Sequence, residues 1–140
     1  MQPKILLKIA AIIIFVHALA HTVGHSGWKK RTEGEKQQVI SQMTDHKFPF
    51  MGTVRSMGDY YDGYGYACTL ALLLIASLLW VVSSATSDLA RKIIMINSIC
   101  LILWGIDELI YFFPLAATFT LVSAALTLLS FFKLRSISKS

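Results

Sequence analysis

Four apolar stretches, each long enough to cross a lipid bilayer, constrain this chain more than any other feature. We place them at about residues 5–25, 58–83, 93–113 and 114–132, and one helical crossing takes roughly 20 residues. The composition agrees, because 55% of the 140 residues are hydrophobic and 15% are charged, whereas soluble domains average about 25% charged. The sequence therefore predicts one all-α domain over residues 1–140, an integral membrane, antiparallel four-helix bundle.

The segment between the first two spans, residues 24–63, is the one long extramembrane loop that we predict. Thr32–Glu35 reads "TEGE" and fits a capping box, with Thr32 as the N-cap of a helix. The residues that follow are amphipathic, which predicts a short interfacial helix lying on the bilayer surface. The aromatic stretch "HKFPFMG" contains Pro49, which ends that helix, and we expect this stretch to dip towards the lipid headgroups.

The distribution of basic residues predicts which way the bundle faces. An even number of spans puts both termini on one side, and the positive-inside rule favours the cytoplasm for the side richer in Lys and Arg. That side would hold Lys4, Lys8, Arg91, Lys92, Lys133, Arg135 and Lys139. One alternative is a cleavable signal peptide ending near Ala18–Ala20. The net charge of +5 could indicate a nucleic-acid partner, but the sequence contains no nucleic-acid-binding motif. We therefore predict no nucleic-acid partner.

Three histidines lie four residues apart in the first span, within the stretch "HALAHTVGHSG". Helical geometry places His21 about 40° and His25 about 80° around the axis from His17. Small residues share this face, and the bulky residues lie opposite, at about 160–260°. Small residues mark helix–helix contacts in membranes, so we predict that the histidines face the bundle interior. The bulky, lipid-facing set is Ile12, Phe15, Val16, Leu19 and Val23.

The other spans carry polar arcs of their own. In the third span the predicted arc is Asn97, Cys100, Trp104, Asp107, Glu108 and Tyr111. In the second span it is Asp59, Asp62, Tyr66, Thr69, Ser77 and Trp80, with Arg55 beside the entry. The fourth span has a stripe of small residues, Ala116, Thr120, Ser123, Thr127 and Ser130, which is typical of a packing seam. Ionisable residues inside membrane spans are functional candidates by default.

These groups share the loop-side half of the predicted bundle and suggest an acid–base site. Histidine titrates near neutral pH, and a desolvated carboxyl group can be raised towards it. The catalytic candidates are His17, His21, Glu108, Asp107 and Asp59, with His17 or His21 exchanging a proton with Glu108. The binding candidates are Arg55, Asp62, Tyr66, Trp104 and Asn97, with Arg55 holding an anionic headgroup. The expected partners are membrane lipid and a lipid-like or hydrophobic small molecule, so the leading hypothesis is an enzyme.

Two alternatives stay open. In the first, His17 and His21, or His21 and His25, chelate zinc or ferrous iron together with Glu108 or Asp62, or serve in proton or ion handling. In the second, the polar groups only fix helix register, and the chain is a structural or accessory subunit that could form a homo-oligomer. Cys68 and Cys100 stand in different spans at different depths with no CxxC motif, so they are poor disulfide candidates, and we interpret them as small buried residues.

Two motifs also carry a resemblance. The stretches "HTVGHSGWKK" and "TDHKFPFMGTVRSMGDYYDGYGY", followed later by the acidic pair Asp107–Glu108, resemble a group of small bacterial four-span membrane proteins without an assigned function. The resemblance covers most of the chain. It implies a multi-pass protein of the bacterial inner membrane and implies no chemistry.

Overall fold

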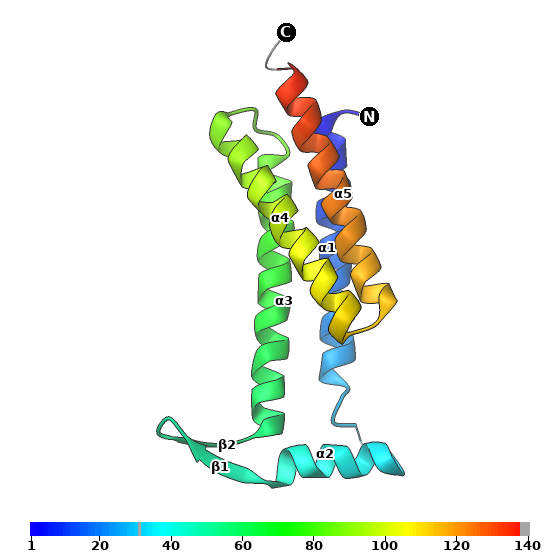
Figure 1. Ribbon diagram of the computed structural model, residues 1–140, viewed down its shortest axis with the longest axis vertical. Coiled ribbons are helices and arrows are strands. Elements are labelled where there is room, and N and C mark those ends of the chain that lie inside the picture. Colours follow the sequence, from blue (N-terminus) through cyan, green and yellow to red (C-terminus); the bar gives the residue numbers. More distant parts are fainter. Residues whose placement is uncertain (31, 138–140) are drawn as a thin grey trace. The chain divides into compact units, whose positions relative to one another are not determined.

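The computed structural model describes residues 1–30 and 32–137, and everything below refers to these residues. Four of its helices are long and apolar enough to cross a membrane, which confirms the predicted fold class. Figure 1 shows the elements in chain order. They are α1 (Pro3–Ser26), α2 (Glu35–Asp45), β1 (Lys47–Phe50), β2 (Thr53–Ser56), α3 (Met57–Val82), α4 (Asp88–Tyr111) and α5 (Pro114–Ile137).

Internal contacts divide the chain into two compact units. Unit 1 comprises Met1–Ala18 and Ala71–Ser140, and unit 2 comprises Leu19–Leu70. Unit 1 thus holds the first part of α1, the second part of α3, and the α4–α5 pair. Unit 2 holds the end of α1, the helix α2, the two strands and the start of α3.

Hydroxyl-bearing residues on α5 form the packing seam of unit 1. The predicted stripe of small residues on α5 is buried along its whole length, as expected. Ser123 Oγ donates to the Ala10 carbonyl at 3.4 Å, and Ser130 Oγ donates to the Pro3 carbonyl at 3.1 Å. Lys133 Nζ donates to the Met1 carbonyl at 3.2 Å. The start of α1 and the end of α5 therefore lie at the same end of unit 1.

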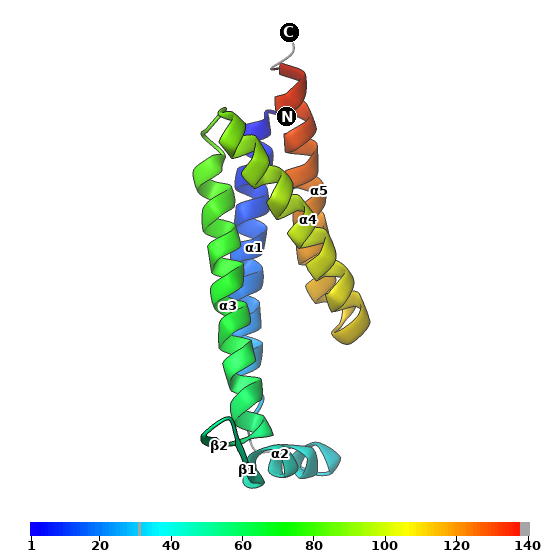
Figure 2. The same cartoon turned by 60° about the vertical axis from the view of Figure 1, so that its left-hand side comes forward.

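Helices α4 and α5 form a tight antiparallel pair around the turn before Pro114 (Figures 1 and 2). Gly105 lies so close to Leu121 that a Cβ atom at position 105 would overlap the leucine side chain. The buried face of α4 is Ala90, Ile94, Asn97, Ser98, Leu101, Gly105 and Glu108. Glycine at position 105 allows this close approach, because it has no side chain to occupy the space.

This buried face corrects the polar arc predicted for the third span. Asn97 and Glu108 are buried as expected, but Cys100, Asp107 and Tyr111 are exposed. The prediction counted polar residues and ignored Gly105, where Leu121 of α5 packs against α4. The lipid-facing side predicted for the first span is confirmed, since its five bulky residues are all exposed.

Unit 2 contains a β-hairpin that the sequence analysis did not predict (Figure 1). Strand β1 pairs antiparallel with β2, with Phe48 opposite Arg55 and Pro49 opposite Val54. The two turn residues, Met51 and Gly52, have φ angles of 45° and 82°. Positive φ at both central residues is the requirement of the tight turn that suits the twist of a hairpin. The stretch expected to be an irregular interfacial dip is therefore an ordered ribbon.

The two loop-side helices of unit 2 begin differently from the prediction. Helix α2 exists as expected, but its N-cap is Gly34 at φ 71°, with no side-chain cap. The predicted capping box at Thr32 is wrong, because the Thr32 amide donates instead to Gln37 Oε1 at 3.1 Å. A reciprocal cap is found at α3, where Ser56 N donates to Asp59 Oδ2 and Asp59 N donates to Ser56 Oγ.

Candidate functional site: two histidine clusters

The first cluster, here the His17 cluster, consists of His17, Glu108 and Thr120 and lies in the core of unit 1. His17 Nε2 is 3.4 Å from Glu108 Oε1, and His17 Nδ1 is 3.2 Å from Thr120 Oγ1. Only 6% of the His17 side chain and 5% of the Glu108 side chain are exposed. The ring of Phe119 stacks on the imidazole with a centroid separation of 5.6 Å. The cluster is therefore a buried polar chain joining α1, α4 and α5.

One carboxylate oxygen of Glu108 is buried without a hydrogen-bond partner among the described residues, and this atom is Oε2. Leaving a buried acceptor unsatisfied costs roughly 1–3 kcal/mol, and more if the group is charged. Such an oxygen can be satisfied by a proton, by a buried water molecule or by a polar group from outside the protein.

The structure confirms the predicted contact between a histidine and Glu108, and it shows that Asp107 is not part of the cluster. His17 lies beside Glu108, as the shared depth and the inward-facing arcs predicted. Asp107 is exposed, so it does not orient the imidazole. Asn97 is buried, but its amide donates to the Ile93 carbonyl of its own helix at 2.9 Å. Trp104 is half-buried near the Glu108 carboxyl group.

The second cluster, here the His25 cluster, is in unit 2 and centres on the Asp62 carboxylate. Trp28 Nε1 donates to Asp62 Oδ1 at 2.6 Å, and the Lys29 ammonium pairs with Asp62 Oδ2. His25 Nε2 lies 3.8 Å from Asp62 Oδ1. The carboxylate thus ties the chain that leaves α1 to the first turns of α3.

The His25 imidazole is enclosed by aromatic rings. Tyr61 and Tyr66 both lie 5.3 Å from it between centroids, and the His21 ring stacks parallel to it at 5.8 Å. His25 is 7% exposed, and its Nε2 atom has no hydrogen-bond partner in the described chain. There is no room for a Cβ atom at Gly65, because it would fall on the imidazole ring. His25 is therefore held by ring packing and by one distant carboxylate.

His21 is the other histidine that we predicted as a candidate for proton exchange with Glu108. In the structure its Nε2 atom lies 3.1 Å from the Gly65 carbonyl oxygen. The Gly65 carbonyl also accepts a bond from Thr69 Oγ1 at 3.2 Å. The contact found for His21 is thus with the main chain of α3, and the carboxylate partners belong to His17 and His25.

Two other predicted site residues serve the fold of unit 2. Asp59 is exposed and caps α3, so orienting an imidazole is not its observed role. Arg55 is exposed on β2 and donates to the Val54 carbonyl at 3.2 Å. Of the residues predicted for binding in this unit, Asp62 and Tyr66 are those that contact a histidine.

The residues missed by sequence reasoning are Trp28, Lys29, Tyr61 and Thr120. Thr120 was assigned to the packing stripe, yet its hydroxyl group also contacts His17. The three others lie near the ends of the apolar spans, and their residue types could have identified them as candidates. Aromatic and basic residues are enriched where helices leave the membrane, and such residues are the natural partners for an acidic residue at the same depth.

A metal centre of three ligands is not present in the described part of the chain, where no group of three or more His, Cys, Asp or Glu side chains could hold an ion. The structure separates the predicted ligands into different pairings, because His17 contacts Glu108 and His25 contacts Asp62. Cys68 is half-buried and Cys100 is exposed, so the interpretation of these cysteines as small buried residues is wrong.

The fold and the two clusters define a class: a small helical membrane protein with histidine–carboxylate pairs in its spans. Comparison adds no closer identification, since no family model, curated protein or solved structure matches this chain.

Proposed function

We propose that this chain is a membrane-embedded protein whose His17–Glu108 pair holds and exchanges a proton, so that its chemistry is acid–base chemistry. The observation that supports this most is the combination of a 3.4 Å contact between His17 Nε2 and Glu108 Oε1 with an unpartnered Oε2. The hydrophobic or lipid-like substrate, the zinc or iron alternative and the homo-oligomer all stay predictions.

The pair is suited to sharing one proton between two arrangements. In one, neutral His17 accepts a hydrogen bond from protonated Glu108; in the other, imidazolium faces carboxylate. Both arrangements have no net charge, which limits their cost in a bilayer, where a lone charge is expensive. Thr120 fits both, because Nδ1 carries a proton in either arrangement and the hydroxyl oxygen of Thr120 can accept a hydrogen bond from it.

The distance between the two groups is also informative. At 3.4 Å the N–O separation is longer than the 2.7–3.2 Å typical of a hydrogen bond. Acid–base partners without substrate often stand apart in this way and tighten when a reacting group is bound. A small movement of α4 or a group placed at Oε2 would close the contact.

Titration of the imidazole signals tests this proposal directly. In NMR spectra of isotope-labelled histidine, we expect the His17 signal to titrate at one pH in the wild type and at another in Glu108→Gln. His46 is exposed and lies outside the pair, so its signal provides the internal control and should not differ between the two proteins. A His17 signal that ignores both pH and the Glu108→Gln change would refute proton exchange in this pair.

We further propose that both termini face the cytoplasm of a bacterial inner membrane, on the basis of the basic-residue distribution. Single cysteines test this in a Cys68→Ala/Cys100→Ala background. Gln42→Cys in α2 should react with an impermeant thiol reagent applied from outside, and Ser136→Cys near the end of α5 should react only after the membrane is opened. Both positions are exposed. Equal labelling from outside at both positions would contradict the proposed topology.

A further inference from the structure

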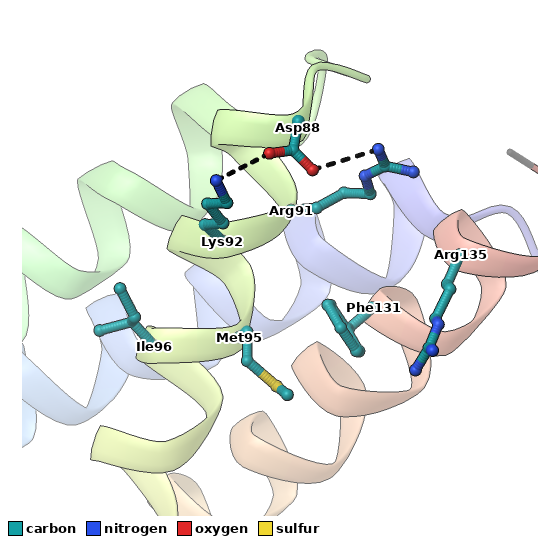
Figure 3. A pocket seen from close by; sticks show the side chains of 7 residues that line it. All are labelled: Asp88, Arg91, Lys92, Met95, Ile96, Phe131 and Arg135. Carbon is teal, nitrogen blue, oxygen red and sulfur yellow. Dashed lines mark hydrogen bonds and ion pairs between the residues drawn. The ribbon is translucent and has the colours of Figure 1, made fainter.

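A groove lies between the start of α4 and the end of α5, entirely within unit 1. Its volume is about 590 Å³. Figures 1 and 2 show that α4 and α5 meet at the turn between them and spread apart towards their other ends, and Figure 3 shows the residues that line the groove there. The groove belongs to neither histidine cluster, and no residue of those clusters lines it.

One part of the groove is basic. Arg91 and Lys92 line it from α4, and Arg135 lines it from the last turn of α5. Asp88 is the only acidic residue in the lining and contacts both Arg91, at 3.3 Å, and Lys92, at 2.9 Å. Three cations against one carboxylate leave a charge of +2. Among residues 1–30 and 32–137, no carboxylate pairs with Arg135.

The other part of the groove is apolar. Met95 and Ile96 follow Lys92 by one helical turn, and Phe131 precedes Arg135 by one turn. Figure 3 shows Phe131 and Met95 facing each other below Asp88, Arg91 and Lys92, with the Arg135 side chain extending alongside Phe131. One turn of helix advances about 5.4 Å along the axis. A ligand seated here would therefore meet cations at one end and apolar side chains a few ångströms further along the spans.

From this polarity we infer that the groove between α4 and α5 binds one anionic phospholipid, with its phosphate at Arg91, Lys92 and Arg135 and an acyl chain along Met95, Ile96 and Phe131. Basic pockets between membrane helices select acidic headgroups by charge. The net charge of +2 favours an anionic headgroup over a zwitterionic one. The apolar lining favours a ligand with an acyl chain over a free anion. Arg91 and Lys92 already contact Asp88, whereas Arg135, on the α5 side of the groove, does not.

Native mass spectrometry of the detergent-purified chain tests the inference. Titration with phosphatidylglycerol and with phosphatidylcholine of the same acyl chains should show one preferentially retained phosphatidylglycerol per chain. Each Lys or Arg near an anionic surface contributes about fivefold in affinity, so Arg91→Gln/Arg135→Gln should bind phosphatidylglycerol roughly 25-fold more weakly. Lys133→Gln removes the same charge from α5 outside the groove and should leave binding nearly unchanged.

Several outcomes would overturn the inference. Equal retention of the two lipids by the wild type would refute the inference. This comparison needs no variant, so the test remains valid if the double variant fails to fold. Equal weakening by Lys133→Gln would mean that general surface charge attracts the lipid. Competition by inorganic phosphate or glycerophosphoglycerol as strong as that of the lipid would mean an anion site without an acyl-chain subsite.

Discussion

Removing one member of the His17–Glu108 pair should cost far more stability than removing both. We expect Glu108→Ala to lower the free energy of unfolding by about 3–5 kcal/mol, because a buried partner is left without its counterpart. His17→Ala should have a similar effect. The measurement is equilibrium unfolding in mixed micelles, with the variants compared in one detergent composition.

Two further variants make this result specific. His17→Leu/Glu108→Met keeps the volume and removes both polar groups, and such replacements of buried pairs are often neutral or stabilising by about 1–4 kcal/mol. Asp107→Ala removes the neighbouring carboxylate, which is exposed, and should change stability by no more than about 0.5 kcal/mol. If the single variants cost no more than Asp107→Ala, the pair does not carry the interaction that we assign to it.

The second large effect is expected at Gly65 of α3. A Cβ atom at this position would fall on the buried His25 ring, so Gly65→Ala must displace the imidazole from its aromatic surroundings. Overpacking of this kind costs about 1–3 kcal/mol. We therefore expect Gly65→Ala to lower the midpoint of thermal unfolding and to move the His25 NMR signals.

Gly63→Ala is the matched control, two residues away on the same helix. Nothing lies within 4 Å of a Cβ atom at Gly63, so the change should be neutral or stabilising by up to about 1 kcal/mol, the helix-propensity gain of Ala over Gly. Adding His25→Ala to Gly65→Ala removes the clash, and the double variant should be more stable than additivity predicts. Identical effects of the two glycine changes would show that the His25 ring is not held against Gly65.

Together the two results would separate the roles of the two clusters. A large coupling between His17 and Glu108 would support a buried pair that shares a proton. A large steric effect at Gly65 would show that His25 is fixed by packing. The metal alternative would instead require that loss of His25 or Asp62 reduces bound zinc or iron in the purified protein.

The sequence alone determined most of the membrane architecture. Four spans, the exposed bulky side of α1, the α5 seam and the closeness of an α1 histidine to an acidic residue of α4 all followed from apolar run length and helical periodicity. These features depend on local geometry, because about 100° per residue fixes which side chains share a face. The β-hairpin was missed because Pro49 was interpreted as a helix breaker and the positive-φ turn at Met51–Gly52 was not considered.

The tertiary structure alone decided which acidic residue enters the site. Asp107 and Glu108 are neighbours about 100° apart on α4, and either could face inward on polarity alone. Gly105 lets Leu121 of α5 approach closely, and the buried face of α4 that contains Gly105 also contains Glu108, while Asp107 points outward. The same holds for Asp62, whose partners Trp28 and Lys29 come from the segment after α1. Periodicity defines faces, but only packing between separate segments decides which face is buried.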